Sequence, residues 1–275
     1  MTENIIEMSD FPGRRMDKTK SVPQSTLMIE GKIAVEVVGV GEGATEVVRE
    51  MAKEEFVLLN RQLFGPNCEF SISDNARQEQ VPEIGIVVFD SSEIGSVRAA
   101  LPVAKSIERA GGMGLSFDLS NNPPPKMLRV SNILLPIGVI GHSGTAAYLG
   151  VFCRGLIVPI LNDTMIGIEF SQGPLAFWAG RSSWVISGEG QGENRALDAI
   201  QDATNMAKEQ EQSFDDADAI LLTIIVSPDF TMGEAAAMAR MLDDSTLLGG
   251  VSFSYSTVVD DHGEGSVEAI LVVTE

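Results

Sequence analysis

The sequence predicts an α/β protein in which a parallel, doubly wound N-terminal sheet precedes a smaller, mixed α/β unit. Three observations carry this prediction. Short β-branched runs alternate with helical patterns from about residue 32 to residue 119, which is typical of a parallel sheet with crossover helices. A glycine turn joins the first of these strands directly to the first helix. A second series of strands and helices begins at Ser182 and ends in two closing strands.

The composition limits the partners that this protein can have. The chain has 275 residues, enough for one large domain or two smaller ones, with 39 acidic and 19 basic residues. Residues 186–275 alone hold 18 acids and 3 bases. Such a surface repels nucleic acid and anionic membrane, so we expect neither as a partner. The sequence has no apolar run of membrane-spanning length and no signal-peptide pattern. We therefore expect no direct membrane insertion and a cytoplasmic location.

Cysteine and histidine are too sparse for the usual metal sites. The chain has 2 cysteines and 2 histidines, and none of them stands at a ligand spacing from another. The two cysteines lie in apolar neighbourhoods and are expected to be buried thiols in a reducing compartment. We expect no metal.

A glycine turn between a strand and a helix is the most distinctive feature of the N-terminal half. The glycines let the backbone approach a ligand closely, and the helix start offers free N–H groups and a positive dipole end to phosphate. The residues expected to contact the ligand are Gly39, Gly41, Gly43 and Ala44. Two alternatives remain open. The same residues satisfy the dinucleotide fingerprint G-x-G-x-x-A, and a tight turn of this kind also occurs without a ligand.

Residues 31–158 are expected to form this nucleotide-binding-like α/β domain, preceded by a flexible arm over residues 1–30. The expected strands cover residues 32–38, 68–73, 84–89, 113–119 and 133–140. The expected helices cover residues 44–60, 97–109 and 144–157. A capping turn at 90–92 should start the second helix, and Pro159 should end the third, which bridges to the rest of the chain.

Ligands of parallel sheets bind where the strands end at their carboxyl side. That edge should bring the glycine turn together with Asp74 and Asn75 and with the turns at 90–94 and 120–122.

Residues 159–275 are expected to form the second α/β domain. The expected strands cover residues 184–186, 219–226, 247–257 and 266–274, and the expected helices cover 174–181, 195–211 and 231–242. Loops are expected at residues 162–171 and 188–194. The last two strands should pair as an antiparallel hairpin.

Two motifs resemble those of the FtsZ/tubulin superfamily. The stretch Val37–Ala44 resembles the family's first phosphate loop, G-V-G-G-G-G. The stretch Gly188–Ala199 is similar to the segment G-x-G-x-A-x-G-E-x-R-A that enters the C-terminal domain of the bacterial proteins. The resemblance covers roughly residues 32–275. It implies a GTPase-like N-terminal domain, a bridging helix, a smaller C-terminal FtsZ-like domain, GTP or GDP as ligand, and head-to-tail self-association or pairing with another FtsZ-family subunit.

The second phosphate loop departs from the family's glycine-rich signature. The matching stretch runs Ser92-Glu93-Ile94-Gly95-Ser96, in which Ser92, Gly95 and Ser96 remain as candidate ligand contacts. Glu93, together with Glu42 in the first loop, places negative charge where phosphate would lie. Two unit charges about 4 Å apart interact by roughly 4 kcal/mol near a protein surface. Unless both side chains point to solvent, we expect no nucleotide or only weakly bound GTP or GDP.

The catalytic loop implied by the resemblance is also altered. The family carries N-x-D-F-x-D there, whereas this chain has Gly167-Ile168-Glu169-Phe170-Ser171-Gln172. Glu169 and Gln172 are the residues left to act on water, and a neutral amide orients water without polarising it as a carboxylate does. The degenerate loop indicates a lost hydrolase.

Three functions are compatible with these patterns. The favoured one is an FtsZ-like cytoskeletal or scaffolding subunit that assembles or binds partners without efficient GTP hydrolysis. The second is a slow GTPase that forms filaments. The third is a Rossmann-type oxidoreductase that holds a ribose with Glu69 or Asp74, which is weakened because Gly188–Ala199 has no place in a dinucleotide domain.

Overall fold

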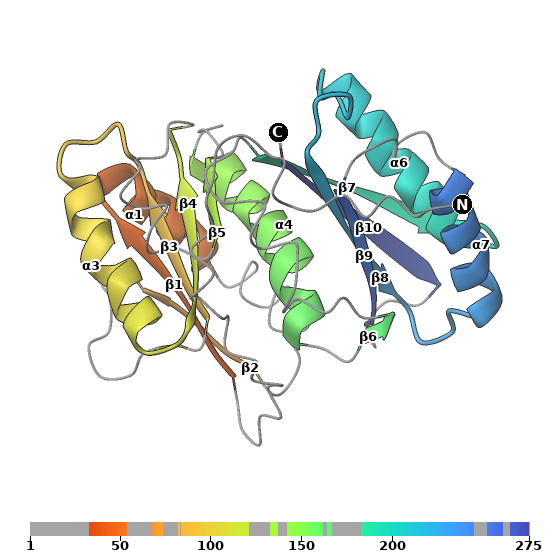
Figure 1. The fold of residues 1–275 in the computed structure, drawn as a ribbon, viewed down its shortest axis with the longest axis horizontal. Coiled ribbons are helices and arrows are strands. Elements are labelled where there is room, and N and C mark those ends of the chain that lie inside the picture. Colours follow the sequence, from red (N-terminus) through yellow and green to blue (C-terminus); the bar gives the residue numbers. More distant parts are fainter. Residues whose placement is uncertain are drawn as a thin grey trace, which may run out of the picture.

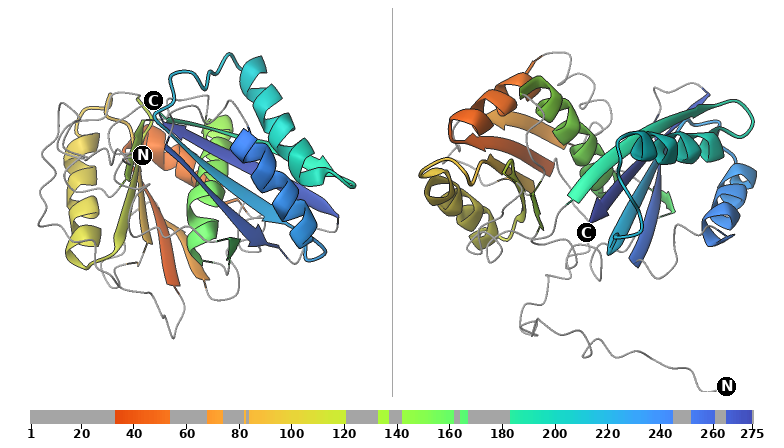
Figure 2. Two further views of the ribbon diagram at one scale, coloured as in Figure 1. Left: turned by 45° about the vertical axis from the view of Figure 1, so that its right-hand side comes forward. Right: turned by 90° about the horizontal axis from the view of Figure 1, so that it is seen from above.

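The structure is a computed structural model that describes residues 33–53, 68–73, 82, 84–120, 133–136, 142–161, 164–166, 183–244, 252–260 and 265–274. It contains two five-stranded sheets, and one long helix lies between them (Figures 1 and 2). The expected N-terminal arm, residues 1–30, lies outside the described residues.

The first sheet is parallel throughout, as the sequence predicts. Its strand order is β2-β1-β3-β4-β5. The strands are β1 (Ile33–Val40), β2 (Cys68–Ser73), β3 (Ile84–Phe89), β4 (Met113–Asp118) and β5 (Ile133–Pro136). Every residue of β3 is buried, which explains its uninterrupted apolar run.

Helices cover both faces of this sheet, which makes it doubly wound (Figure 1). Helix α1 (Glu42–Met51) packs with β1 and β3 through one set of alternating strand residues, including Val88. Helix α3 (Ser96–Arg109) packs on the opposite set, Val87 and Phe89. Because side chains alternate along a strand, the two helices lie on opposite faces.

Helix α4 (His142–Leu161) lies between the two sheets and is apolar over most of its surface because it is buried from both sides. Burial raises the pKa of its Cys153 thiol to about 12. The prediction that Pro159 ends this helix is wrong, since the helix continues to Leu161. A proline at 159 cannot donate to the carbonyl of Gly155, and the Thr223 hydroxyl donates to that oxygen instead, over 2.8 Å. None of the described helices is long and apolar enough to cross a membrane.

The second sheet is mixed, with strand order β6-β9-β8-β10-β7. Its strands are β6 (Thr164–Ile166), β7 (Ser183–Gln191), β8 (Ala219–Val226), β9 (Ser252–Val259) and β10 (Ser266–Thr274). Helices α6 (Arg195–Glu209) and α7 (Met232–Asp244) cover the face that points away from α4 (Figure 1). Strands β8 and β9 are parallel, and the other pairs are antiparallel.

Three sequence predictions for this unit are corrected. The closing strands do not form a hairpin: β9 pairs with β8, whereas β10 inserts between β8 and β7. Helix α7 returns the chain to the edge of the sheet at which β8 begins, so β9 runs parallel to β8. Residues 188–191, expected in a loop, extend β7, and 164–166, also expected in a loop, form β6 beside β9. The helix expected at 174–181 lies outside the described residues.

Candidate functional site

The turn between β1 and α1 has the close packing that its glycines predict. A Cβ on Gly39 would lie 2.8 Å from the carbonyl oxygen of Ala44 and 2.9 Å from the Cα of Thr45, so only glycine lets α1 start this near the strand. Gly41 has a φ of 98°, a left-handed conformation that glycine adopts without strain. The helix therefore begins directly above the carboxyl end of β1, where a parallel sheet binds its ligands.

The start of α1 is occupied by a carboxylate from the same chain. The backbone N–H of Glu42 donates to Oε2 of Glu93 over 3.0 Å, and that of Gly43 donates to Oε1 over 2.7 Å. A Cβ on Gly41 would lie 2.3 Å from the same Oε2. The first N–H groups of a helix have no partner within the helix and carry the positive end of its dipole, so they favour an anion. Glu93 supplies that anion here.

The turn that carries Glu93 is itself held by hydrogen bonds. The Asp90 carboxylate accepts from the backbone N–H and the hydroxyl of Ser92, over 2.8 and 2.6 Å, and the Glu93 N–H donates to the Asp90 carbonyl. The expected capping turn at 90–92 does not cap the helix. Gly95, with a φ of 89°, is the N-cap residue of α3. The extra residues between the turn and the helix direct the Glu93 side chain toward α1.

Ser96 links the two turns of the site. Its hydroxyl donates to the carbonyl of Val40 over 3.0 Å and accepts from the Asp90 N–H over 3.3 Å. This hydroxyl is therefore used for structure in the described conformation.

Sequence reasoning missed Asp118, which fastens the next strand end to the same edge. Its Oδ1 accepts from the Ser91 N–H over 3.0 Å and from the N–H and hydroxyl of Ser120 over 3.1 and 2.9 Å. The hydroxyls of Ser91 and Ser120 are also hydrogen-bonded to each other. Asp118 is fully buried. Its position at the end of an apolar strand, two residues before a serine, is the pattern of an Asx turn and could have identified it.

A groove of about 520 Å³ lies beside the glycine turn. Its described lining comes from the end of β1 and from α1 and α3: Val38, Gly39, Val40, Gly41, Glu42, Thr45, Glu46, Arg49, Ala99 and Val103. Arg49 is the single basic residue in this described lining, and it is ion-paired with Glu46. The charge next to the turn is thus acidic, which opposes a polyphosphate.

The structure brings most of the predicted ligand contacts to one edge. The hydrogen bonds of Glu93 and Ser96 join two turns at this edge. One turn contains Gly39, Gly41, Gly43 and Ala44, and the other contains Ser92, Gly95 and Ser96. Asp74, Asn75, Glu169 and Gln172 lie outside the described residues, so their roles stay predictions. Within the described ranges, no group of three or more His, Cys, Asp or Glu residues is arranged to hold a metal ion.

The described part of β2 does not support Glu69 as a ribose ligand. Glu69 stands opposite Ala34 in the register of β1 and β2, near the amino end of both strands. The glycine turn follows the carboxyl end of β1. The strand order also differs from the 3-2-1-4-5-6 order of Rossmann dinucleotide domains.

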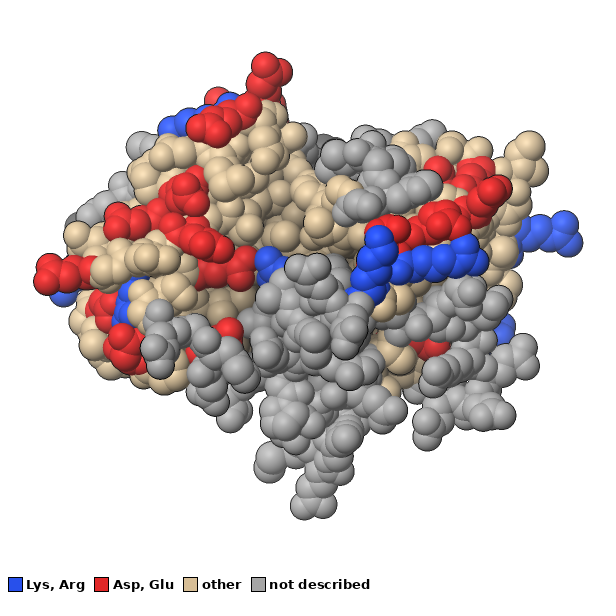
Figure 3. Space-filling model, turned by 180° about the vertical axis from the view of Figure 1, so that it is seen from behind, with Lys and Arg blue, Asp and Glu red and all other residues tan. Residues whose placement is uncertain are grey.

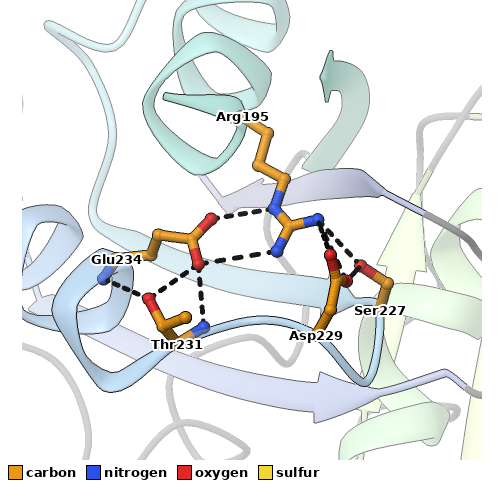
Figure 4. Close-up of polar contacts among 5 residues, drawn as sticks. All are labelled: Arg195, Ser227, Asp229, Thr231 and Glu234. Atoms are coloured by element: carbon orange, nitrogen blue, oxygen red, sulfur yellow. Dashed lines mark hydrogen bonds and ion pairs between the residues drawn. The ribbon is translucent and has the colours of Figure 1, made fainter. Parts of the chain in front are cut away.

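The second glycine motif leads to a buried arginine network (Figure 4). Arg195, 5% exposed at the start of α6, donates from Nε to Glu234 over 2.8 Å. Its Nη1 donates to both carboxylate oxygens of Asp229 and to the Ser227 hydroxyl, each over 3.1 Å. Glu234 also accepts from the N–H of Thr231 over 2.8 Å, and the Thr231 hydroxyl accepts from the Glu234 N–H, which forms a capping box on α7.

This network lowers the pKa of both carboxyl groups. For Asp229 the hydrogen bond from the Ser227 hydroxyl is the main cause, followed by that from Arg195. For Glu234 burial raises the pKa, but hydrogen bonds from Arg195 and Thr231 outweigh it. Both groups are ionised at neutral pH, and the network joins the start of α6 to the start of α7. We infer that the role of this network is to stabilise the fold.

No family model and no curated protein sequence matches the chain. Two solved structures of FtsZ from M. jannaschii match it closely in shape. The empty FtsZ dimer has 14% identity and a TM-score of 0.57, over 89% of this chain and 88% of that one. The W319Y mutant has 15% identity and a TM-score of 0.58, over 89% and 91%.

A third match is CetZ2 from Haloferax volcanii, whose structure is a GTPγS-bound protofilament. Its identity is 12% and its TM-score 0.50, over 88% of this chain and 94% of that one. At these identities the similarity establishes the fold and leaves the ligand open. The matches cover nearly the whole chain, and the protein has an FtsZ/tubulin-like fold.

Proposed function

We propose that this protein is an FtsZ-like cytoskeletal or scaffolding subunit with a degenerate GTP site, which assembles or binds partners without efficient GTP hydrolysis. One observation carries the proposal. The Glu93 carboxylate accepts hydrogen bonds from the N–H groups of Glu42 and Gly43 at the start of α1. Those N–H groups are the ones that a phosphate would need at this turn.

When a nucleotide phosphate binds here, the Glu93 side chain either moves away or stays beside the phosphate. If it leaves, the protein loses two hydrogen bonds to a charged acceptor, each contributing about 1.5–3 kcal/mol. If it stays about 4 Å away, like-charge repulsion costs roughly 4 kcal/mol. Either route weakens binding by at least about a hundredfold, since each 1.4 kcal/mol is tenfold in affinity.

Assembly is supported by an exposed apolar side chain at the same edge. Ile94 follows Glu93 at the tip of the turn and is fully exposed, at 106%. A large aliphatic side chain gains up to about 1.5–3 kcal/mol when a partner covers it. The compared structures include an FtsZ dimer and a CetZ2 protofilament. We therefore assign this edge to head-to-tail contact with a second copy or with another FtsZ-family subunit.

The assembly part has a direct test. Ile94→Asp removes the apolar tip without disturbing packing inside the subunit, because nothing covers Ile94 there. At about 500 mM salt, where contacts between exposed charges are screened, it should weaken self-association in sedimentation velocity by tenfold or more while leaving the unfolding midpoint unchanged. The exposed Met232, 71% accessible at the start of α7, offers a matched control, Met232→Asp. Equal association of the parent and Ile94→Asp would remove this edge from the interface.

A weakly active GTP-binding filament protein is the second candidate, and one observation favours it. The β1–α1 turn keeps a glycine with positive φ, Gly41, and a groove of about 520 Å³ is open beside it. In this case Glu93 moves aside when GTP arrives. Titration with fluorescent GTP, followed by phosphate release, separates the two candidates. We expect a Kd above about 10 μM, equivalent to less than about 6.8 kcal/mol of binding, and no turnover. Tighter binding with phosphate release would establish the second candidate.

A further inference from the structure

Helix α3 carries a row of basic side chains on one outer face. Arg98, Lys105 and Arg109 are spaced by seven and four residues, and at 100° per residue these spacings keep all three on one face. Arg98 and Arg109 are exposed and Lys105 is half-buried. Within the described part of the chain, none of the three side chains forms an ion pair or a hydrogen bond. We call these three residues the basic stripe.

The basic stripe borders a hollow that has apolar walls. A groove of about 570 Å³ runs along the helix, and its described lining combines the stripe with Gly95, Val97, Leu101 and Pro102. Leu101 and Pro102 lie between Arg98 and Lys105 on the helix surface. A partner that fits here must offer carboxylates and at least one apolar side chain.

A surface of this kind follows α6 on the second-sheet unit. Five of the ten residues from Glu209 to Asp218 are acidic, and all five are exposed. Glu209, Glu211, Asp215 and Asp216 form no ion pair with the described residues. Met206, 38% exposed, lies one helical turn before Glu209 and supplies an apolar side chain next to them. We call residues 209–218 the acidic turn.

The two surfaces cannot meet within one molecule. Helix α3 lies at one flank, and α6 lies at the other, beyond both sheets and α4 (Figures 1 and 2). In Figure 3 acidic side chains lie on both halves of the face, whereas basic side chains are more frequent on the first-sheet half than on the second-sheet half.

We propose that the basic stripe of one subunit docks the acidic turn of a second copy of this chain. The stripe spans 12 residues of helix, and its 11 rises of 1.5 Å give a length of about 17 Å, which the ten-residue acidic turn can follow. Because the contact joins two different surfaces on opposite flanks, each added copy leaves one stripe and one turn open. Such a heterologous contact continues into an open row of subunits.

This contact is separate from the strand-edge contact proposed above. It uses neither Ile94 nor the glycine turn, so it predicts a sideways association that persists in Ile94→Asp. Exposed ion pairs are individually weak and are screened by salt, which makes this association dependent on low ionic strength. Added salt therefore weakens this association, whereas it does not weaken an association held by apolar contacts.

Charge exchange gives the sharpest test. The stripe variant carries Lys105→Glu with Arg109→Glu, and the turn variant carries Asp215→Lys with Asp216→Lys. In each variant alone, the reversed surface meets a partner surface of the same charge. In a mixture, the reversed stripe of one variant meets the reversed turn of the other, and the charges are opposite again. The control carries Lys53→Glu with Arg240→Glu, which changes the net charge as the stripe variant does at exposed positions outside both surfaces.

Self-association is measured by sedimentation velocity of the full chain at about 50 mM and about 500 mM salt. Every protein in this test, the parent included, carries Ile94→Asp, so that the strand-edge contact does not contribute. We expect parent and control to associate at low salt and to dissociate at high salt. Each reversed variant should associate at least tenfold more weakly, and the equimolar mixture should recover to within about threefold of the parent. Circular dichroism confirms that each variant is folded. A parent that is monomeric at low salt, or a mixture that does not recover, would overturn the proposal. Dependence on the stripe but not on the turn would assign the stripe to a different acidic partner and would equally overturn it.

Discussion

Replacement of Gly190 by alanine should destabilise the fold severely, because β7 lies directly against the backbone of α6. A Cβ on Gly190 would lie 1.8 Å from the carbonyl oxygen of Arg195 and 2.7 Å from the nitrogen of Ala199. Gly188, two residues earlier on the same strand face, has the same constraint, with a Cβ 2.2 Å from the nitrogen of Ala203. The clashing atoms belong to helix backbone and cannot rotate away.

The magnitude follows from the size of this overlap. An unstrained Cβ contact needs about 3.4 Å, so α6 must move by more than 1 Å along its packed length. Overpacking that flexible side chains can absorb costs about 1–3 kcal/mol, and a rigid backbone places Gly190→Ala at or above the upper end. We expect a loss of at least about 3 kcal/mol, which corresponds to a fall in Tm of about 6–12 °C at 2–4 °C per kcal/mol.

The assay is equilibrium unfolding in urea, with thermal unfolding as a second measurement. Gly233→Ala is the matched control, because the nearest atom to its added Cβ is the Thr231 hydroxyl oxygen at 3.6 Å and the residue lies within α7. That change should be neutral or stabilise by up to about 1 kcal/mol. A Gly190→Ala protein within about 1 kcal/mol of the parent would refute the close-packing explanation of this motif.

The remaining predictions concern the Arg195 network. Glu234→Ala should lower the free energy of unfolding by about 3–5 kcal/mol, because it leaves a buried guanidinium short of its main partner. Glu50→Ala, which breaks a more exposed pair with Lys53, should change it by less than about 1 kcal/mol, and equal losses would contradict the assignment. The network should also make the fold acid-labile. The pKa values of Asp229 and Glu234 lie below their ordinary 3.8 and 4.5, so this stabilisation is complete above those values and is lost as the pH falls through the lowered ones. Urea titrations between pH 3 and pH 7 should show a smaller loss for Asp229→Asn with Glu234→Gln than for the parent.

Strands buried on both faces were predictable from the sequence alone. The bounds of β3, β8 and β10 agree with the expected ranges because an apolar run bounded by turn residues leaves no other assignment. The parallel order of the first sheet followed from alternation with helices. The overall fold was therefore accessible even though no sequence relative matches.

Pairing in the second sheet could not be read from the same patterns. Periodicity shows that 252–259 and 266–274 are strands, but it does not say which strand lies between them. Gly188 and Gly190 resembled a loop because glycines usually mark turns, whereas here they make room for helix backbone. The sequence shows that these positions lack a side chain, but it does not show that helix backbone fills the space.

The sequence predicted where the candidate site lies in the fold, but not how the Glu93 side chain fills it. The sequence placed the two glycine-containing turns at one edge and predicted that Glu93 opposes phosphate there, and their role in binding phosphate stays a prediction. It could not show that this carboxylate turns onto the start of α1, since that depends on the Asp90–Ser92 turn and on the left-handed Gly95. Interactions between residues about 50 positions apart are set by tertiary structure.

The proposed function depends on the Glu93 carboxylate occupying the phosphate position at the start of α1. Its most direct test is the GTP affinity of Glu93→Ala relative to the parent, measured by fluorescent-nucleotide titration, with Glu193→Ala as a control that removes one exposed charge from the second-sheet unit. We expect Glu93→Ala to bind GTP at least about a hundredfold more tightly than the parent, a gain of about 2.8 kcal/mol or more, and Glu193→Ala to bind it as the parent does. Equal affinity of Glu93→Ala and the parent would contradict the proposed function.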